Sequence, residues 1–160
     1  MIIIDVETTG FGHNDRIIEV AALETGTGKE WHTLINPQIK VPEFITKLTG
    51  ITSEMVETAP YFADVSETLR KMIGRQAILG YNVAFDKRFL VKEDPKFNCF
   101  AYKDFLKYVR SLGHKTKNNK LSTVAEFFEI SIVGAHRALK DVQTVYQLYK
   151  RLGYEDPDII

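Results

Sequence analysis

The sequence predicts an α/β fold built on a mixed sheet with helices on its faces. Three strand patterns separated by short turns occupy the first 36 residues, which favours an antiparallel start. After residue 60, helical patterns alternate with short apolar runs, an order typical of parallel strands joined by crossover helices. Both types of strand pairing are therefore expected in this chain.

Five strands are expected. The first begins at Ile2 as an apolar run without polar alternation, which suits a strand buried on both faces, and it ends at a Thr-Thr-Gly turn. The second and third are expected near residues 16–23 and 29–36, on either side of a Thr-Gly-Thr-Gly turn. Two shorter strands are expected near residues 77–80 and 97–101.

Helical spacing of apolar residues predicts helices between and after these strands. A short helical region contains Phe44 and Leu48, and a longer helix follows Pro60. Asp86 lies in another helix, and three further helical stretches follow it. The inner face of the helix after Pro60 consists of Phe62, Val65, Leu69 and Met72.

Length and composition fit one domain, expected over residues 1–160. A chain of 160 residues with 44% hydrophobic residues can bury one sizeable core without cross-links. The single cysteine, Cys99, excludes an internal disulfide and is expected to be buried at a strand position. Because no apolar stretch could span a membrane and no signal peptide fits before Asp5, we expect a cytoplasmic protein.

The charge balance restricts the possible partners. A net charge of zero, from 21 basic and 21 acidic residues, counts against a protein that coats duplex DNA non-specifically, because such proteins usually carry an excess of positive charge. One locally basic run is either a solvated loop or a contact for nucleic-acid phosphates. This run consists of His114, Lys115, Lys117 and Lys120.

Three acidic segments carry the strongest functional signal. Side chains repeat every two residues along a strand, so Asp5 and Glu7 of the first strand point to the same face. Asp141 lies on the inner edge of an apolar helical stripe at residues 137–152, and Asp86 is placed similarly. Each acid alone is more often a solvated or turn residue. Together, carboxylates beside apolar sequence are best tolerated if they share bound cations.

His136 stands just before the helix of Asp141, so we expect it on a loop beside the acidic pocket. A lone histidine is usually solvated or forms a local hydrogen bond. A neutral imidazole at this position could take a proton from metal-held water, which is general-base work suited to its ordinary pKa.

The ordered set of motifs resembles the DEDDh exonuclease family, which includes proofreading subunits and domains of bacterial replicative polymerases. The motifs are DVETTG, IIEVAAL, LTGIT, GYNVAFD and HRALKD, and together they extend over nearly the whole chain. A single DxE triplet is a weak signal, whereas the ordered set is a strong one. The resemblance implies a ribonuclease H-like fold, with a mixed five-stranded sheet flanked by helices.

The same resemblance implies a site and a reaction. Two divalent metal ions, Mg²⁺ or Mn²⁺, would be bound by Asp5, Glu7, Asp86 and Asp141, with His136 as the general base. Hydrolysis of an anionic phosphodiester needs charge neutralisation, an acidified water and a stabilised leaving oxygen, and two metals about 3.5–4 Å apart supply all three. Oxygen ligands suit these ions rather than zinc. The implied activity is 3′-to-5′ hydrolysis of single-stranded or frayed DNA ends, which releases nucleoside 5′-monophosphates in proofreading or end trimming.

Contacts with the terminal nucleotide are implied for Thr8, Thr49, Gly50 and Ile51, with Ile51 making apolar contact to the base or sugar. Asn82 and Phe85 are expected to support the site, although for Phe85 packing in the core is the more common role. Where relatives often have an Asp-Thr pair, this chain has Asp104-Phe105. That departure questions one supporting contact and involves no metal ligand.

The expected partners are single-stranded DNA 3′ ends and a DNA polymerase subunit, with no membrane. Three alternatives remain open. An exoribonuclease of the same fold is one, because the metal chemistry is indifferent to the sugar. A non-catalytic polymerase-binding module is another, although all five site residues are retained. A carboxylate-rich calcium-binding protein is the third, and it lacks the contiguous loop that such sites generally use.

Overall fold

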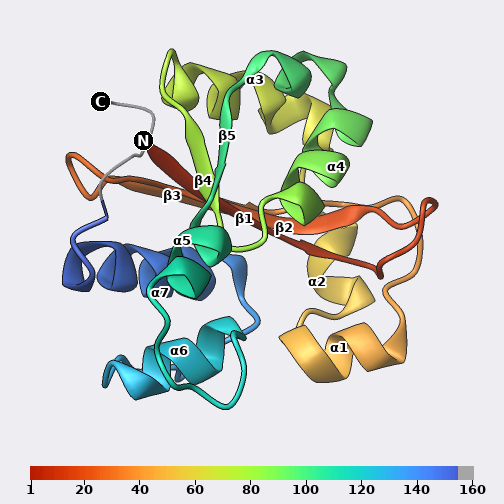
Figure 1. Cartoon of the computed structure of the whole chain (residues 1–160). Helices are drawn as coiled ribbons and strands as arrows, with labels where there is room; N and C mark the ends of the chain where they lie inside the picture. Colours follow the sequence, from red (N-terminus) through yellow and green to blue (C-terminus); the bar gives the residue numbers. More distant parts are fainter. Residues whose placement is uncertain (155–160) are drawn as a thin grey trace.

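The computed structural model describes residues 1–154, which form a five-stranded sheet between two layers of helices (Figure 1). The strands are β1 (Ile2–Thr8), β2 (Ile17–Glu24), β3 (Glu30–Leu34), β4 (Ile78–Gly80) and β5 (Tyr102–Asp104). Their order is β3-β2-β1-β4-β5, so β1 is the central strand. It pairs antiparallel with β2 and parallel with β4, while β3 and β5 continue these two directions. The predicted mixed sheet is confirmed.

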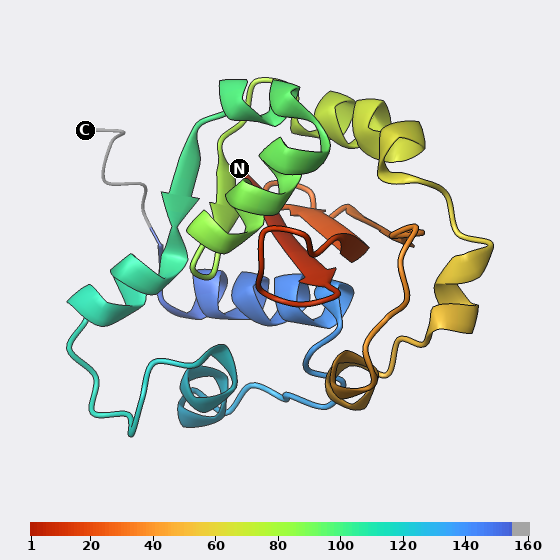
Figure 2. The same ribbon diagram turned by 90° about the vertical axis from the view of Figure 1, so that its right-hand side faces the viewer.

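Helices cover both faces of this sheet. The described helices are α1 (Glu43–Thr49), α2 (Ser53–Glu57), α3 (Phe62–Ile73), α4 (Ala84–Glu93), the 3-10 helix η1 (Pro95–Cys99), α5 (Phe105–Ser111), α6 (Leu121–Phe127) and α7 (Ala138–Arg151). In Figure 1, α3 and α4 lie above the sheet and α7 runs beneath it. Figure 2 shows α7 running across that lower face. None of the described helices is long and apolar enough to cross a membrane.

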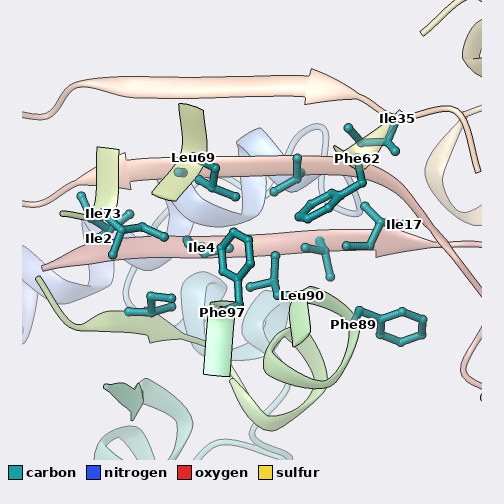
Figure 3. Close-up of a cluster of buried hydrophobic side chains, with 14 of the residues drawn as sticks. Ile2, Ile4, Ile17, Ile35, Phe62, Leu69, Ile73, Phe89, Leu90 and Phe97 are labelled. Atoms are coloured by element: carbon teal, nitrogen blue, oxygen red, sulfur yellow. The ribbon is translucent and has the colours of Figure 1, made fainter. Parts of the chain in front are cut away.

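The side chains of β1 point alternately to the two faces of the sheet, so they belong to two separate core clusters. Ile2 and Ile4 pack against α3 and its surroundings, where Figure 3 shows them beside Leu69 and Phe97. Ile3, between them, belongs to the opposite cluster, which contains the buried face of α7. Because side chains alternate along a strand, the odd-numbered residues after Ile3 also point toward α7. The buried face of β1 therefore becomes acidic on the α7 side only.

Most predicted elements are found with shifted ends. The strands expected at residues 16–23, 29–36 and 77–80 correspond to β2, β3 and β4. The helices expected around Phe44, after Pro60, around Asp86 and at residues 137–152 correspond to α1, α3, α4 and α7. Residues 155–160 of the expected domain lie outside the described part of the chain.

The strand expected at residues 97–101 is wrong. The Asp94 side chain accepts the backbone N–H of Lys96, and Pro95 occupies the first helical position, so the chain forms η1 there. The apolar residues of this segment therefore lie in a helical turn, and the strand begins only at Tyr102. Cys99 is exposed, so its predicted burial at a strand position is also wrong.

Candidate active site

Carboxylates from β1 and α7 meet beneath the sheet. Asp5, Glu7 and Asp141 each offer a carboxylate oxygen, and these atoms lie within 4.8 Å of one another. Asp5 and Glu7 share a face because they are two residues apart on β1, and Asp141 reaches them from the first turn of α7. The structure therefore brings three of the four predicted metal ligands into one cluster.

Asp86 lies beside β1, beyond the end of the neighbouring strand β4. On β1, the short strand β4 pairs only with Ile2 and Ile3, so it does not extend along the rest of that strand. The Asp86 carboxylate lies at this free edge and accepts the backbone N–H of Val6 at 3.1 Å. Asp86 is almost completely buried and raises the pKa of both Asp5 and Glu7, although it is not part of the 4.8 Å cluster.

These carboxylates repel one another. Burial raises the pKa of Asp5 well above its usual range, and the neighbouring acids, Asp86 first, raise it further. Burial and then Asp141 raise the pKa of Glu7 to about 8. Burial also raises the pKa of Asp86 to about 8, against the lowering effect of its backbone hydrogen bonds. Burial raises the pKa of Asp141 to about 6, and nearby His136 partly opposes this rise.

Divalent cations fit this site on two grounds. No ion pair within residues 1–154 reaches Asp5, Glu7 or Asp141, so bound cations would relieve the repulsion among these carboxylates. All the clustered donors are carboxylate oxygens, which Mg²⁺ and Mn²⁺ prefer.

Glu19 is a buried acid that was not assigned a role from the sequence. It lies on β2 directly opposite Glu7 and is only 1% exposed. Its carboxylate accepts from Nη2 of Arg137 at 2.7 Å, and from the backbone N–H of Ala138 at 2.9 Å. This pair fixes the start of α7 to the sheet. The available signal was an acid inside the apolar run IIEVAAL, where an unpaired charge would be costly.

His136 immediately precedes this anchored segment. Its side chain is exposed, and its backbone φ of 64° lies in the left-handed region. Such a conformation costs a non-glycine residue about 1–3 kcal/mol, and it persists where neighbouring contacts enforce it, often at functional sites. His136 and Asp141 line the same cavity, so a proton acceptor lies beside the acidic cluster.

Most of the predicted substrate-contact residues make hydrogen bonds or core contacts within the protein. The Thr8 hydroxyl donates to the Gly10 carbonyl at 2.6 Å. The Thr49 hydroxyl donates to a backbone carbonyl of its own helix and accepts the N–H of Ile51 at 3.1 Å. Ile51 is fully buried in the core beneath α1 and α2, whereas Gly50 is exposed. Because the Ile51 side chain is not exposed in this structure, its apolar contact with a nucleotide stays a prediction.

The two predicted supporting residues belong to local networks. The backbone N–H of Asn82 donates to Oδ1 of Asp104 at 3.1 Å, and the same oxygen caps the start of α5. Phe85 packs its ring against Phe89, with centroids 5.0 Å apart, and against Phe11 at 6.0 Å. Phe85 thus contributes packing at the margin of the core, in agreement with its more common role.

A cavity of about 910 Å³ opens beside the acidic cluster. It is lined by Phe11, Tyr81, Asn82, Leu106, Arg110, Asn118, Asn119, Lys120, Leu121, Ser122, Ile132, Ala135, His136, Asp141 and Thr144. Phe11, which was not singled out from the sequence, is 65% exposed on this wall. Of the basic run, Lys120 lines the cavity, whereas the ring of His114 packs against Phe127 and Phe128 at the end of α6.

Comparison with known proteins agrees with this geometry. The family model described as "Exonuclease", RNase_T, matches residues 2–149. The chain is 34% identical over 158 residues to "DNA polymerase III PolC-type" from Caldanaerobacter subterraneus subsp. tengcongensis, covering 94% of this chain and 11% of the relative. It is 29% identical to "DNA polymerase III subunit epsilon" from Aquifex aeolicus, covering 94% of this chain and 79% of that subunit. The chain thus spans about a tenth of the PolC-type relative.

A solved structure gives the same fold. The nuclease domain of 3′hExo, described as a DEDDh family member bound to rAMP, aligns with a TM-score of 0.79 at 22% identity, covering 94% of this chain and 90% of that one. Members of this family use divalent metal ions, in agreement with the carboxylate cluster. The chain belongs to the exonuclease family, among the DEDDh, DnaQ-like members with a ribonuclease H-like fold.

Proposed function

We propose that this protein is a 3′-to-5′ exodeoxyribonuclease that removes nucleoside 5′-monophosphates from single-stranded or frayed DNA ends. The observation that supports this proposal most strongly is the convergence of Asp5, Glu7 and Asp141 within 4.8 Å, with His136 on the wall of the adjoining cavity. It combines a site for divalent cations with a neighbouring proton acceptor, the two requirements for phosphodiester hydrolysis.

The proposed ligands are the four acids Asp5, Glu7, Asp86 and Asp141, which would hold two Mg²⁺ or Mn²⁺ ions. When bound, the ions would acidify a water molecule and stabilise the leaving 3′ oxygen. His136 takes the proton from the attacking water, as a general base. The contacts of Glu19 with Arg137 and Ala138 hold the adjoining start of α7, so they support the position of His136.

A DNA substrate is supported by the relatives, whose names are those of DNA polymerase components. Proofreading or end trimming is the corresponding role, with a polymerase as partner. A frayed or mismatched terminus should be cut faster than a paired one, because freeing a paired end costs a few kcal/mol of unpairing and unstacking. We also propose that residues 1–160 form one exonuclease domain, which the family match over residues 2–149 supports.

The test uses matched 5′-labelled DNA and RNA strands with Mg²⁺ and with Mn²⁺. We expect a descending ladder from linear single-stranded DNA, mononucleotide product, and intact circular single strands. The His136→Ala variant serves as the control for contaminating nucleases. Efficient cutting of circles would contradict an exonuclease, and faster degradation of RNA than of matched DNA would favour an exoribonuclease. Absence of cleavage under all conditions would favour a non-catalytic polymerase-binding module.

A further inference from the structure

Part of the lining of this cavity is basic and rich in amides, and we call it the basic wall. Arg110 comes from the last turn of α5, and Lys120 stands just before α6. Both side chains are exposed, and within residues 1–154 neither makes a hydrogen bond or an ion pair. The side chains of Asn118, Asn119 and Ser122 complete this wall. Asp141, on the catalytic side, is the cavity's single acidic lining residue among those described.

These two cations differ from three arginines elsewhere in the chain. Arg16, Arg70 and Arg137 are each paired with a carboxylate at 2.7–3.1 Å. Arg110 and Lys120 instead line the cavity that Asp141 and His136 also line. In a protein with a net charge of zero, two unpaired cations beside a phosphodiesterase site provide a local attraction for an anionic strand.

The basic wall is fixed relative to the active site. The hydroxyl of Tyr81 donates to the carbonyl of Asn119 at 2.7 Å, and Oδ1 of Asn118 accepts the N–H of Lys120 at 2.9 Å. Tyr81 follows β4 directly and precedes the helix that carries Asp86. The segment before α6 is therefore tied to the same β4–α4 connection that places a catalytic acid.

The cavity is large enough to hold a nucleotide ligand. Pockets that enclose a drug-sized ligand measure about 300–1,000 Å³, and at about 910 Å³ this cavity is at the upper end of that range. We propose that the cavity binds the single strand upstream of the scissile bond, with Arg110 and Lys120 contacting its phosphates and the amides of Asn118 and Asn119 available for hydrogen bonds. This inference rests on the proposed nuclease function and adds the path of the strand.

The test compares two substrates of different length. Thymidine 5′-monophosphate p-nitrophenyl ester presents one nucleotide and no upstream strand, whereas a single-stranded dT12 presents both. For Arg110→Gln/Lys120→Gln, kcat/KM on dT12 should fall at least about tenfold at 50 mM salt. The slope of log(kcat/KM) against log[salt] should become shallower by about 1.4, because each single-strand phosphate contact contributes about 0.7. Hydrolysis of the ester should stay within about twofold of the wild-type rate.

The matched control is Lys71→Gln/Arg75→Gln, which also removes two positive charges. Lys71 is in the last turn of α3 and Arg75 follows that helix, near the opposite end of β1. It should leave both substrates and the salt slope unchanged. An unchanged salt slope in Arg110→Gln/Lys120→Gln, or an equal loss on ester and dT12, would overturn the strand path while leaving the nuclease function standing. Failure of the wild-type protein to cleave either substrate would overturn both proposals.

Discussion

At the proposed catalytic centre, the proposed metal ligands and the proposed general base are different kinds of residue in different surroundings. Asp5 and Glu7 are enclosed on the sheet, and their raised pKa values express the repulsion that a cation would relieve. His136 is exposed on a loop and offers a nitrogen, which Mg²⁺ and Mn²⁺ prefer less than oxygen. Metal binding and proton transfer should therefore be separable by substitution.

Substitution of Asp5 or Asp141 by Ala should weaken Mn²⁺ binding and abolish cleavage. His136→Ala should retain Mn²⁺ binding and lose about 10²–10⁴-fold in rate, the usual contribution of a general base. Calorimetric titration with Mn²⁺ beside single-turnover kinetics measures both quantities. His13→Ala, at another exposed histidine, is the control and should behave like the wild type. Near-normal turnover by His136→Ala would remove its assigned role.

Between elements, the most consequential contact joins β2 to the start of α7. Glu19 is buried, whereas the Arg137 side chain is 38% exposed, so the pair is only partly shielded from solvent. Its importance lies in geometry: α7 carries Asp141 three residues after the capped Ala138, and His136 immediately precedes Arg137. Weakening the contact between Glu19 and the start of α7 should therefore affect the positions of Asp141 and His136 more than the total stability.

Glu19→Gln should lower the free energy of unfolding by about 1–3 kcal/mol, the cost of leaving a partly buried hydrogen-bonding group unsatisfied. It should also lower the single-turnover rate at saturating Mn²⁺, because the start of α7 is less constrained. Urea unfolding and single-turnover kinetics measure the two effects. Asp94→Asn, which breaks the Arg70–Asp94 pair on the other side of the sheet, is the control. It should lose stability with little loss of rate, and equal rate losses in both variants would contradict the positioning role.

The sequence predicted the parts of the site that depend on local periodicity. Alternation along β1 placed Asp5 and Glu7 on one face, and the apolar stripe of α7 placed Asp141 at its inner edge. Contacts between distant segments could not be predicted in this way. Glu19 and Arg137 are 118 residues apart, and the sequence around either residue does not indicate its partner. The same limit applies to Ile51, whose burial depends on a cluster that it forms with Ile18 of β2 and other residues.

For the whole molecule, the acidic cluster links folding to pH. In the metal-free protein, burial raises the pKa values of Glu7 and Asp86 to about 8, far above those of the unfolded chain. A carboxyl with a raised folded pKa stabilises the fold fully below its unfolded pKa, and this contribution is lost as pH rises through the folded value. Hydrogen bonds lower the pKa values of Glu24, Glu54 and Glu67, so these groups do not mask this trend.

The metal-free protein should therefore lose thermal stability between pH 5 and pH 8.5, and divalent ions should restore it mainly at the upper end, where they no longer compete with protons. At a hundredfold excess over Kd, Mn²⁺ should add about 2.7 kcal/mol at pH 8.5, which corresponds to about 5–10 °C in Tm for a domain of this size. Thermal unfolding followed by circular dichroism, with EDTA and with Mn²⁺ at each pH, measures the effect. Asp5→Asn/Asp141→Asn should show a flatter pH profile and little response to metal. Equal stabilisation by Mn²⁺ at pH 5 and pH 8.5, or a metal-free Tm that rises across this range, would contradict the coupling of the acidic cluster to the fold.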